Sequence, residues 1–289
     1  YYYFGHYIAA FLTKLSGINS AITYNLMIAT LFAFCFSLTF SLAGNLIYLF
    51  LKESFEDLKI GNCPSTLLRM VSLSNHLKIG NWKLIIIGGL LSATLVSLGA
   101  NLHPAYYNLK MKIFDKPYCD GAKTYWYPNA TRYIGYCPDV EDKTIHEFPS
   151  YSFIVSDLHG HVSDIPFVLT FLALTLTLLL KIKENKTLSL FQLLTSHFLL
   201  PLLLAIFFMT NQWDYPIYLM VLGSALLWGF YQHYGWTTKT LTKSISLGIA
   251  IILFSIPFFL PFLSGFDQIA KGVAFVNAHS LPHQLLILW

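Results

Sequence analysis

The sequence is poor in charged residues, and this scarcity decides its class. Only 11% of its 289 residues are Asp, Glu, Lys or Arg, whereas soluble domains carry roughly 25%. Hydrophobic residues make up 55% of the chain, and its mean hydropathy is +0.57. The net charge of +4 is small and no basic run is present, so nothing argues for a nucleic acid partner. These values predict an integral membrane protein surrounded by membrane lipid.

Cysteine is also scarce, and the sequence contains no internal repeat and no low-complexity segment. Of four cysteines, Cys119 and Cys137 share one long loop. They would form a disulfide if that loop were extracytoplasmic, and two free thiols are the equal alternative. The chain starts inside a Tyr-Tyr-Tyr-Phe run and stops at Leu-Trp within an apolar stretch. We therefore expect a piece of a longer protein, cut at both ends.

Long apolar runs predict an all-α fold, a polytopic bundle of membrane helices in one domain over residues 1–289. A helix that crosses a bilayer needs about 20 mostly apolar residues. Six segments qualify, namely residues 25–51, 83–100, 165–181, 192–209, 215–231 and 244–263. Residues 7–18 are apolar but short, and they suit an interfacial or re-entrant helix. A long loop over residues 101–164 follows the second span.

The distribution of Lys and Arg predicts which loops face the cytoplasm. With six spans, loops 52–82, 182–191 and 232–243 share one side, and they hold most of the basic residues of the short loops. Short cytoplasmic loops are enriched in Lys and Arg. Loop 101–164 and the turn 210–214 are therefore expected outside, where most acidic and histidine side chains gather. We predict a multi-pass cell-membrane protein whose functional loops are extracytoplasmic.

The segment before the third span carries an acid and two histidines at alternate positions, Asp157, His159 and His161. In an extended chain these side chains point to one face, and in a helix the first and last lie one turn apart. Either geometry suits a divalent cation such as Mg²⁺ or Mn²⁺, or a general base oriented by a neighbour. The alternative is a polar cap where the chain enters the membrane. Glu147 is near enough in sequence to join this cluster.

Three further segments carry candidate substrate-binding residues. Trp213 and Asp214 join two spans, and an aromatic ring beside an acid is a common sugar-contacting arrangement, although Asp214 is equally well placed to cap the next helix. Arg132 is a candidate phosphate clamp because a guanidinium offers paired donors, or else an ordinary surface arginine. Tyr3 and His6 belong to an aromatic segment that suits either substrate contact or an interfacial anchor.

Five motifs together resemble a known group of proteins. They are Tyr-Tyr-Tyr-Phe-Gly at 1–5, Tyr-Pro-Asn-Ala-Thr-Arg at 127–132, Glu-Phe-Pro-Ser-Tyr-Ser-Phe at 147–153, Ser-Asp-Leu-His-Gly-His at 156–161 and Asn-Gln-Trp-Asp-Tyr-Pro at 211–216. Their order and spacing resemble the uncharacterised multi-spanning "YYY" membrane proteins of archaea and Chloroflexi. That group is distantly similar to GT-C glycosyltransferases, which use polyprenyl-phosphate-linked sugars as donors.

The resemblance implies a helical membrane core with its active site at the extracytoplasmic face. The leading hypothesis is a glycosyltransferase of GT-C type that moves a sugar from a lipid-linked donor to an acceptor. Asp157 and Glu147 would supply the base, His159 and His161 would orient it or hold a cation, and Arg132 would bind the phosphate. GT-C enzymes typically carry an essential acid in their first outer loop, and that segment would precede Tyr1.

Two other classes remain open. One is a transporter or permease, which the sequence disfavours because the acids lie at helix ends and in loops rather than near the bilayer midplane. The other is a membrane metal-dependent hydrolase, which the Asp-x-His-x-His pattern alone suggests.

Overall fold

The chain is helical throughout the part that its structure describes. The computed structural model describes residues 3–56, 79–114, 127–136, 139–141, 143–183, 195–266, 275 and 279–288, and only the backbone of residues 53–56, 79–81, 127, 195 and 196. Apart from one isolated β-bridge between Tyr136 and Asp139, the regular structure of these residues consists of helices. The predicted all-α class is confirmed. Tyr1, Tyr2, Cys119 and Cys137 lie outside the described residues.

Tertiary contacts divide the chain into two compact units, formed by residues 1–97 with 158–267 and by residues 98–157 with 268–289. We call them the bundle and the loop unit. The bundle contains α1 (Phe4–Ser16), α2 (Ser20–Glu56), α4 (Ile79–Leu98), α7 (Gly160–Lys183), α9 (Leu200–Thr210), α10 (Asp214–Tyr234) and α11 (Thr238–Leu263). The loop unit contains α5 (His103–Asn108), α6 (Pro149–Val155) and α12 (Pro282–Leu288). The single membrane domain stays a prediction.

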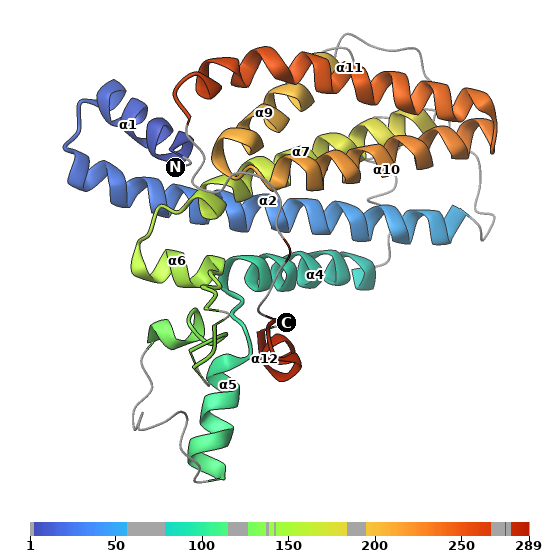
Figure 1. Cartoon of the computed structure of the whole chain (residues 1–289). Helices are drawn as coiled ribbons and strands as arrows, with labels where there is room; N and C mark the ends of the chain where they lie inside the picture. Colours follow the sequence, from blue (N-terminus) through green and yellow to red (C-terminus); the bar gives the residue numbers. More distant parts are fainter. Residues whose placement is uncertain are drawn as a thin grey trace. The chain divides into compact units, whose positions relative to one another are not determined.

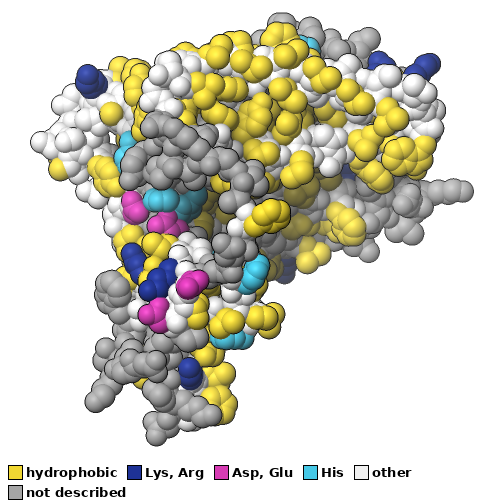
Figure 2. Space-filling view, viewed as in Figure 1, with side chains coloured by type: hydrophobic (Ala, Val, Ile, Leu, Met, Phe, Trp, Pro, Cys, Tyr) yellow, Lys and Arg dark blue, Asp and Glu magenta, His cyan; other side chains and the backbone are white. Residues whose placement is uncertain are grey.

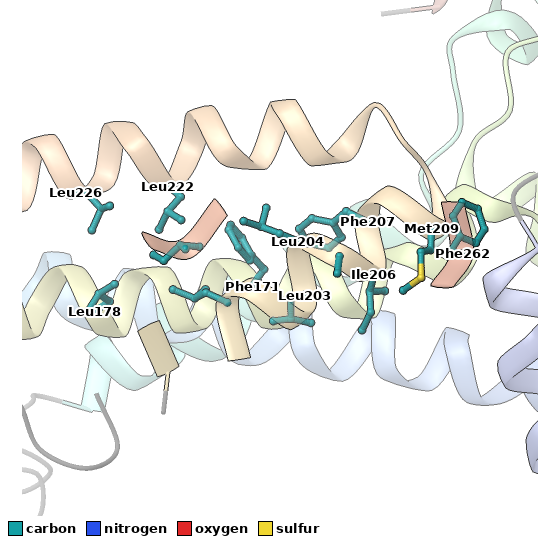
Figure 3. Packing of buried hydrophobic residues seen from close by; sticks show 13 residues of the cluster. Phe171, Leu178, Leu203, Leu204, Ile206, Phe207, Met209, Leu222, Leu226 and Phe262 are labelled. Carbon is teal, nitrogen blue, oxygen red and sulfur yellow. The ribbon is translucent and has the colours of Figure 1, made fainter. Parts of the chain in front are cut away.

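Within the bundle, α7 and α9 form the centre. Helix α7 packs against α2, α9 and α10, and α11 packs against α9 and α10 (Figure 1). Nearly every residue of the short helix α9 is buried, because neighbours surround it. The core consists mainly of Leu and Phe side chains from these helices, and Phe171 meets Phe207 edge to face with ring centroids 5.3 Å apart (Figure 3). A helix that is apolar all round is buried in this way.

Three described helices are long and apolar enough to cross a membrane, at Ser20–Lys52, Gly160–Lys183 and Thr238–Leu263. A fourth candidate is the helix pair Trp82–Leu98 and His103–Ile113, taken together as one broken span. A helix covers at least part of each of the six predicted spans. However, α9 is shorter than a membrane span, and α10 is not among the candidate spans. The structure supports three to four candidate spans.

The outer surface of the bundle is apolar, as a lipid-facing surface is. Phe50, Leu95 and Ile245 are each 59% or more exposed. Hydrophobic side chains cover much of the visible face over α10 and α11 (Figure 2). Soluble monomers rarely expose apolar patches of this kind. The surface therefore fits the membrane class that composition predicts.

The loop unit has a small core of its own. Tyr107, Tyr133, Ile134 and Leu288 are buried together, and the ring of His103 lies 4.8 Å from that of Tyr133. The backbone N–H of Leu102 donates to the carbonyl of Ile287 at 2.9 Å, which ties the C-terminal helix α12 to the start of α5. Much of the predicted long loop therefore folds as a compact unit.

Candidate functional site

Helix α7 begins inside the polar motif at residues 156–164, several residues before the start that the sequence predicts. The third span was expected from residue 165, but α7 begins at Gly160 and holds Pro166 inside it. Proline lacks an N–H, so α7 lacks the backbone hydrogen bond that residue 166 would otherwise donate to the carbonyl of Val162. The correction places His161 in the first turn and Asp164 inside a candidate span.

Three helices hold the start of α7 through close contacts. The backbone N–H of Leu158 donates to the hydroxyl of Tyr24 on α2 at 3.0 Å. Gly160 lies against α9 so closely that an added Cβ would stand 2.7 Å from the carbonyl oxygen of Thr210. On α1, Gly5 lies so close to the side chain of Ser163 that an added Cβ would clash with it. The position of the motif is therefore set by packing from three directions.

His159 and His161 form a pair at this end of the bundle. Their Nδ1 atoms are 3.0 Å apart and their ring centroids 5.0 Å apart. His159 is exposed and His161 is half-buried. At this distance one ring donates a hydrogen bond to the other, or both nitrogens bind one cation, because two imidazole nitrogens without a proton between them repel. The sequence predicted that this segment is either extended or helical throughout. The structure combines the two, because residues 157–159 lie outside the helix and His161 lies within it.

Two carboxyl groups, one on α7 and one on α10, interact with each other. Asp164 is fully buried, and the Asp214 carboxyl of α10 lies within hydrogen-bonding reach of it. The Nδ2 of Asn211 donates to Oδ2 of Asp214 at 2.9 Å. The capping role considered for Asp214 is wrong, because the N-cap residue of α10 is Trp213 and no side chain caps the helix. Asp214 is instead held by the turn before it and turned toward α7.

The other predicted contacts of the bundle lie near its surface. The ring of Tyr3 is 42% exposed and packs 5.1 Å from that of Phe262. His6 is exposed on α1. The side chain of Trp213 is 75% exposed, so its ring face is accessible. An accessible indole suits stacking on a ligand, whereas a buried one would not.

In the loop unit, backbone hydrogen bonds pair the segment that carries Arg132 with the segment that precedes Glu147. The N–H of His146 donates to the carbonyl of Thr131 at 2.8 Å, and the N–H of Thr144 donates to that of Ile134 at 3.3 Å. The residues after Thr131 and His146 are Arg132 and Glu147, both half-buried. Because this pairing is antiparallel, Arg132 and Glu147 lie on opposite sides of the hydrogen bond between Thr131 and His146, so the structure brings their segments together.

Asp157 ends the loop unit after an unusual turn. Ser156 closes α6 with a φ of +55°, a conformation that non-glycine residues adopt rarely. The N–H of Asp157 donates to the carbonyl of Ser152 at 2.9 Å, and its side chain is half-buried. Backbone conformations of this kind cluster at functional sites, where surrounding contacts maintain them.

Comparison with known proteins shows the family. The family model of uncharacterised membrane proteins, DUF2298, matches residues 1–289. The chain belongs to this family. No curated protein and no solved structure matches it. The resemblance to multi-spanning membrane proteins is thereby confirmed at the level of a membrane protein family, and this DUF2298 chain is a membrane protein with several apolar helical spans.

Two residues of this DUF2298 chain escaped the sequence reasoning. Asp164 was counted only among the acids of loop 101–164, because the third span was expected from residue 165. The sequence could have indicated its role, because in a helix that has already begun an acid three residues after His161 lies on nearly the same helix face as that histidine. Ser156 carried no signal, because its φ depends on how α6 ends.

Proposed function

We propose that the chain is a membrane glycosyltransferase of GT-C type, transferring a sugar from a polyprenyl-phosphate donor to an acceptor at the extracytoplasmic face. The observation that supports it most is the gathering of histidines and carboxyls at one end of an apolar bundle, where α1, α2 and α9 hold the start of α7. Polar groups near hydrocarbon are costly, and those that persist usually bind or react.

The proposed roles follow from chemistry. Displacement of a lipid phosphate by a hydroxyl requires a base for the acceptor proton and positive charge for the departing phosphate. Asp157, with Glu147, takes the proton, and Arg132 pairs with the phosphate oxygens. Trp213 and Asp214 contact the sugar, the indole by stacking and the carboxylate by accepting hydroxyl hydrogen bonds. Tyr3 and His6 complete the substrate contacts.

The histidine pair fits a divalent cation. Two nitrogens bound at about 2.1 Å and at right angles stand about 3.0 Å apart, which matches the Nδ1 separation of His159 and His161. Imidazole is a ligand of transition metals, whereas Mg²⁺ prefers oxygen. Of the two ions that we consider, we therefore expect Mn²⁺, with Asp157 as an oxygen ligand. The cation would supply positive charge against the departing phosphate.

The metal role is tested with His161→Ala, using sugar transfer from a polyprenyl-phosphate donor by the full-length protein in membranes. We expect transfer to fall by about 10-fold or more, as for the loss of a metal-supporting group, and added Mn²⁺ to restore part of it. The variant should also lose Mn²⁺ binding measured by electron paramagnetic resonance. His233→Ala, at the far end of α10, is the matched control. Unchanged Mn²⁺ binding in His161→Ala would assign the histidines to structure alone.

The six-span topology is part of the proposal and is tested by labelling. We expect Trp213→Cys, in a cysteine-free variant, to react with an impermeant thiol reagent in intact cells, because the α9–α10 turn lies outside. Lys239→Cys, at the start of α11, should react only after permeabilisation, since basic short loops face the cytoplasm. Labelling of Lys239→Cys from outside would reverse the arrangement and remove the active site from the extracytoplasmic face.

A second candidate is a proton-coupled transporter. The burial of Asp164 inside a candidate span favours it, because ionisable groups within membrane helices mark proton and ion pathways. The transfer assay separates the two, since a transporter would show no glycosyl transfer with any lipid-linked sugar.

A further inference from the structure

Asp164 presents a buried carboxyl that lacks a donor. It is 0% exposed, and among the described residues no other acidic side chain is buried as completely. Neither of its oxygens accepts a hydrogen bond from a donor in the described part of the chain. A buried carboxylate normally accepts hydrogen bonds or pairs with a positive charge, because desolvation otherwise makes it very costly.

The neighbours of Asp164 indicate which kind of group could bind its carboxyl oxygens. Asp214 lies within hydrogen-bonding reach, and Tyr218, one turn further along α10, interacts electrostatically with both carboxyls. These are the titratable side chains that interact with Asp164 among the described residues. On the side of α1, Gly5, which carries no charge, lies against Ser163, the residue before Asp164. Two ionised carboxylates offer each other only acceptors, so their approach requires a proton or a cation between them.

We propose that Asp164 and Asp214 form a proton-binding site that holds one proton between its two carboxyl groups. The Oδ–H of Asp164 donates to a carboxylate oxygen of Asp214, and the pair carries a net charge of −1. A proton needs no further ligand and no additional space, whereas a metal ion would need both. Like-charged carboxyls in close contact share a proton for this reason.

The surroundings decide which group carries the proton. Asp214 is half-exposed and already accepts a hydrogen bond from the Asn211 amide. Asp164 is fully buried and accepts no hydrogen bond from a donor in the described part of the chain, so we assign the proton to Asp164. On the core side, the ring of Tyr218 packs 6.1 Å from that of Phe171 and 5.2 Å from that of Phe207. Water is therefore excluded on the core side, and the proton exchanges through Asp214.

Infrared difference spectroscopy of the full-length protein in lipid vesicles tests this site. At neutral pH the wild-type protein should show the C=O stretching band of a protonated carboxyl, and Asp164→Asn should remove it. Asp214→Asn should keep the band but shift it to the frequency of a less strongly hydrogen-bonded acid, because the ionised acceptor is gone. Asp139→Asn removes a solvent-exposed carboxyl paired with Lys143 and should leave the band unchanged.

Each outcome is decisive, and none depends on the proposed glycosyl transfer. A band that survives unchanged in Asp164→Asn, or one that is absent from the wild type at neutral pH, overturns the proposal. A band that appears only after a chelator is added shows that a metal ion bridges the carboxyls and also overturns it. If Asp164→Asn fails to fold, the shift expected in Asp214→Asn tests the same hydrogen bond, and an unshifted band contradicts it.

Discussion

The substitution Asp157→Asn is expected to lower sugar transfer by about 10²-fold or more, because a positioned proton-transfer group contributes roughly 10²–10⁴-fold. The amide keeps the shape of the side chain but has no basicity. Folding and insertion should change little, since the side chain is half-buried, and the main-chain hydrogen bond from Asp157 to Ser152 does not involve it. The assay is transfer from a polyprenyl-phosphate sugar by the full-length protein in membranes, normalised to the folded amount.

The matched control for this prediction is Asp139→Asn, which removes an exposed carboxyl of the same unit together with its 2.9 Å ion pair to Lys143. An exposed ion pair contributes little to stability, so this variant should transfer sugar at the wild-type rate. If Asp157→Asn also retained the wild-type rate, Asp157 would not be the base.

Replacing Gly160 with Ala is expected to destabilise the bundle by about 1–3 kcal/mol, the usual cost of adding atoms where no space exists. The new Cβ would stand 2.7 Å from the carbonyl oxygen of Thr210. That atom belongs to the backbone at the end of α9, so it cannot rotate away as a side-chain tip can. Gly160→Val should destabilise the bundle more than Gly160→Ala, because its side chain is larger. Thermal unfolding in detergent, followed by tryptophan fluorescence, measures the change.

The same substitution should displace the histidine pair, since Gly160 lies between His159 and His161. We therefore expect Gly160→Ala to weaken Mn²⁺ binding as well as stability. Gly223 on α10 is the matched control because a Cβ there meets nothing within 4 Å. Gly223→Ala should be neutral or stabilising by up to about 1 kcal/mol, from the better helix propensity of alanine. Equal stability of the two variants would mean that α7 and α9 do not meet at this glycine.

Helix α10 illustrates where sequence reasoning about the fold reaches its limit. Apolar runs locate helices well, because each residue reports its own preference for lipid or water. The turn at 210–214 was also predicted, as the gap between two apolar runs. The sequence predicted that α9 and α10 each cross the membrane, but α9 is buried inside the bundle and neither is among the candidate spans, because an apolar core helix has the same composition as a lipid-exposed one.

The sequence by itself determined the membrane class, the all-α fold and the residues worth testing, because composition and motif order are local properties. Only the tertiary structure decided which of them meet. It brought Asp214 to Asp164, paired the backbone of Thr131 with that of His146, and placed α7 against Tyr24, Gly5 and Thr210. These contacts join residues distant in the chain, and close helix packing selects them through the shapes of both partners, which one segment alone does not contain.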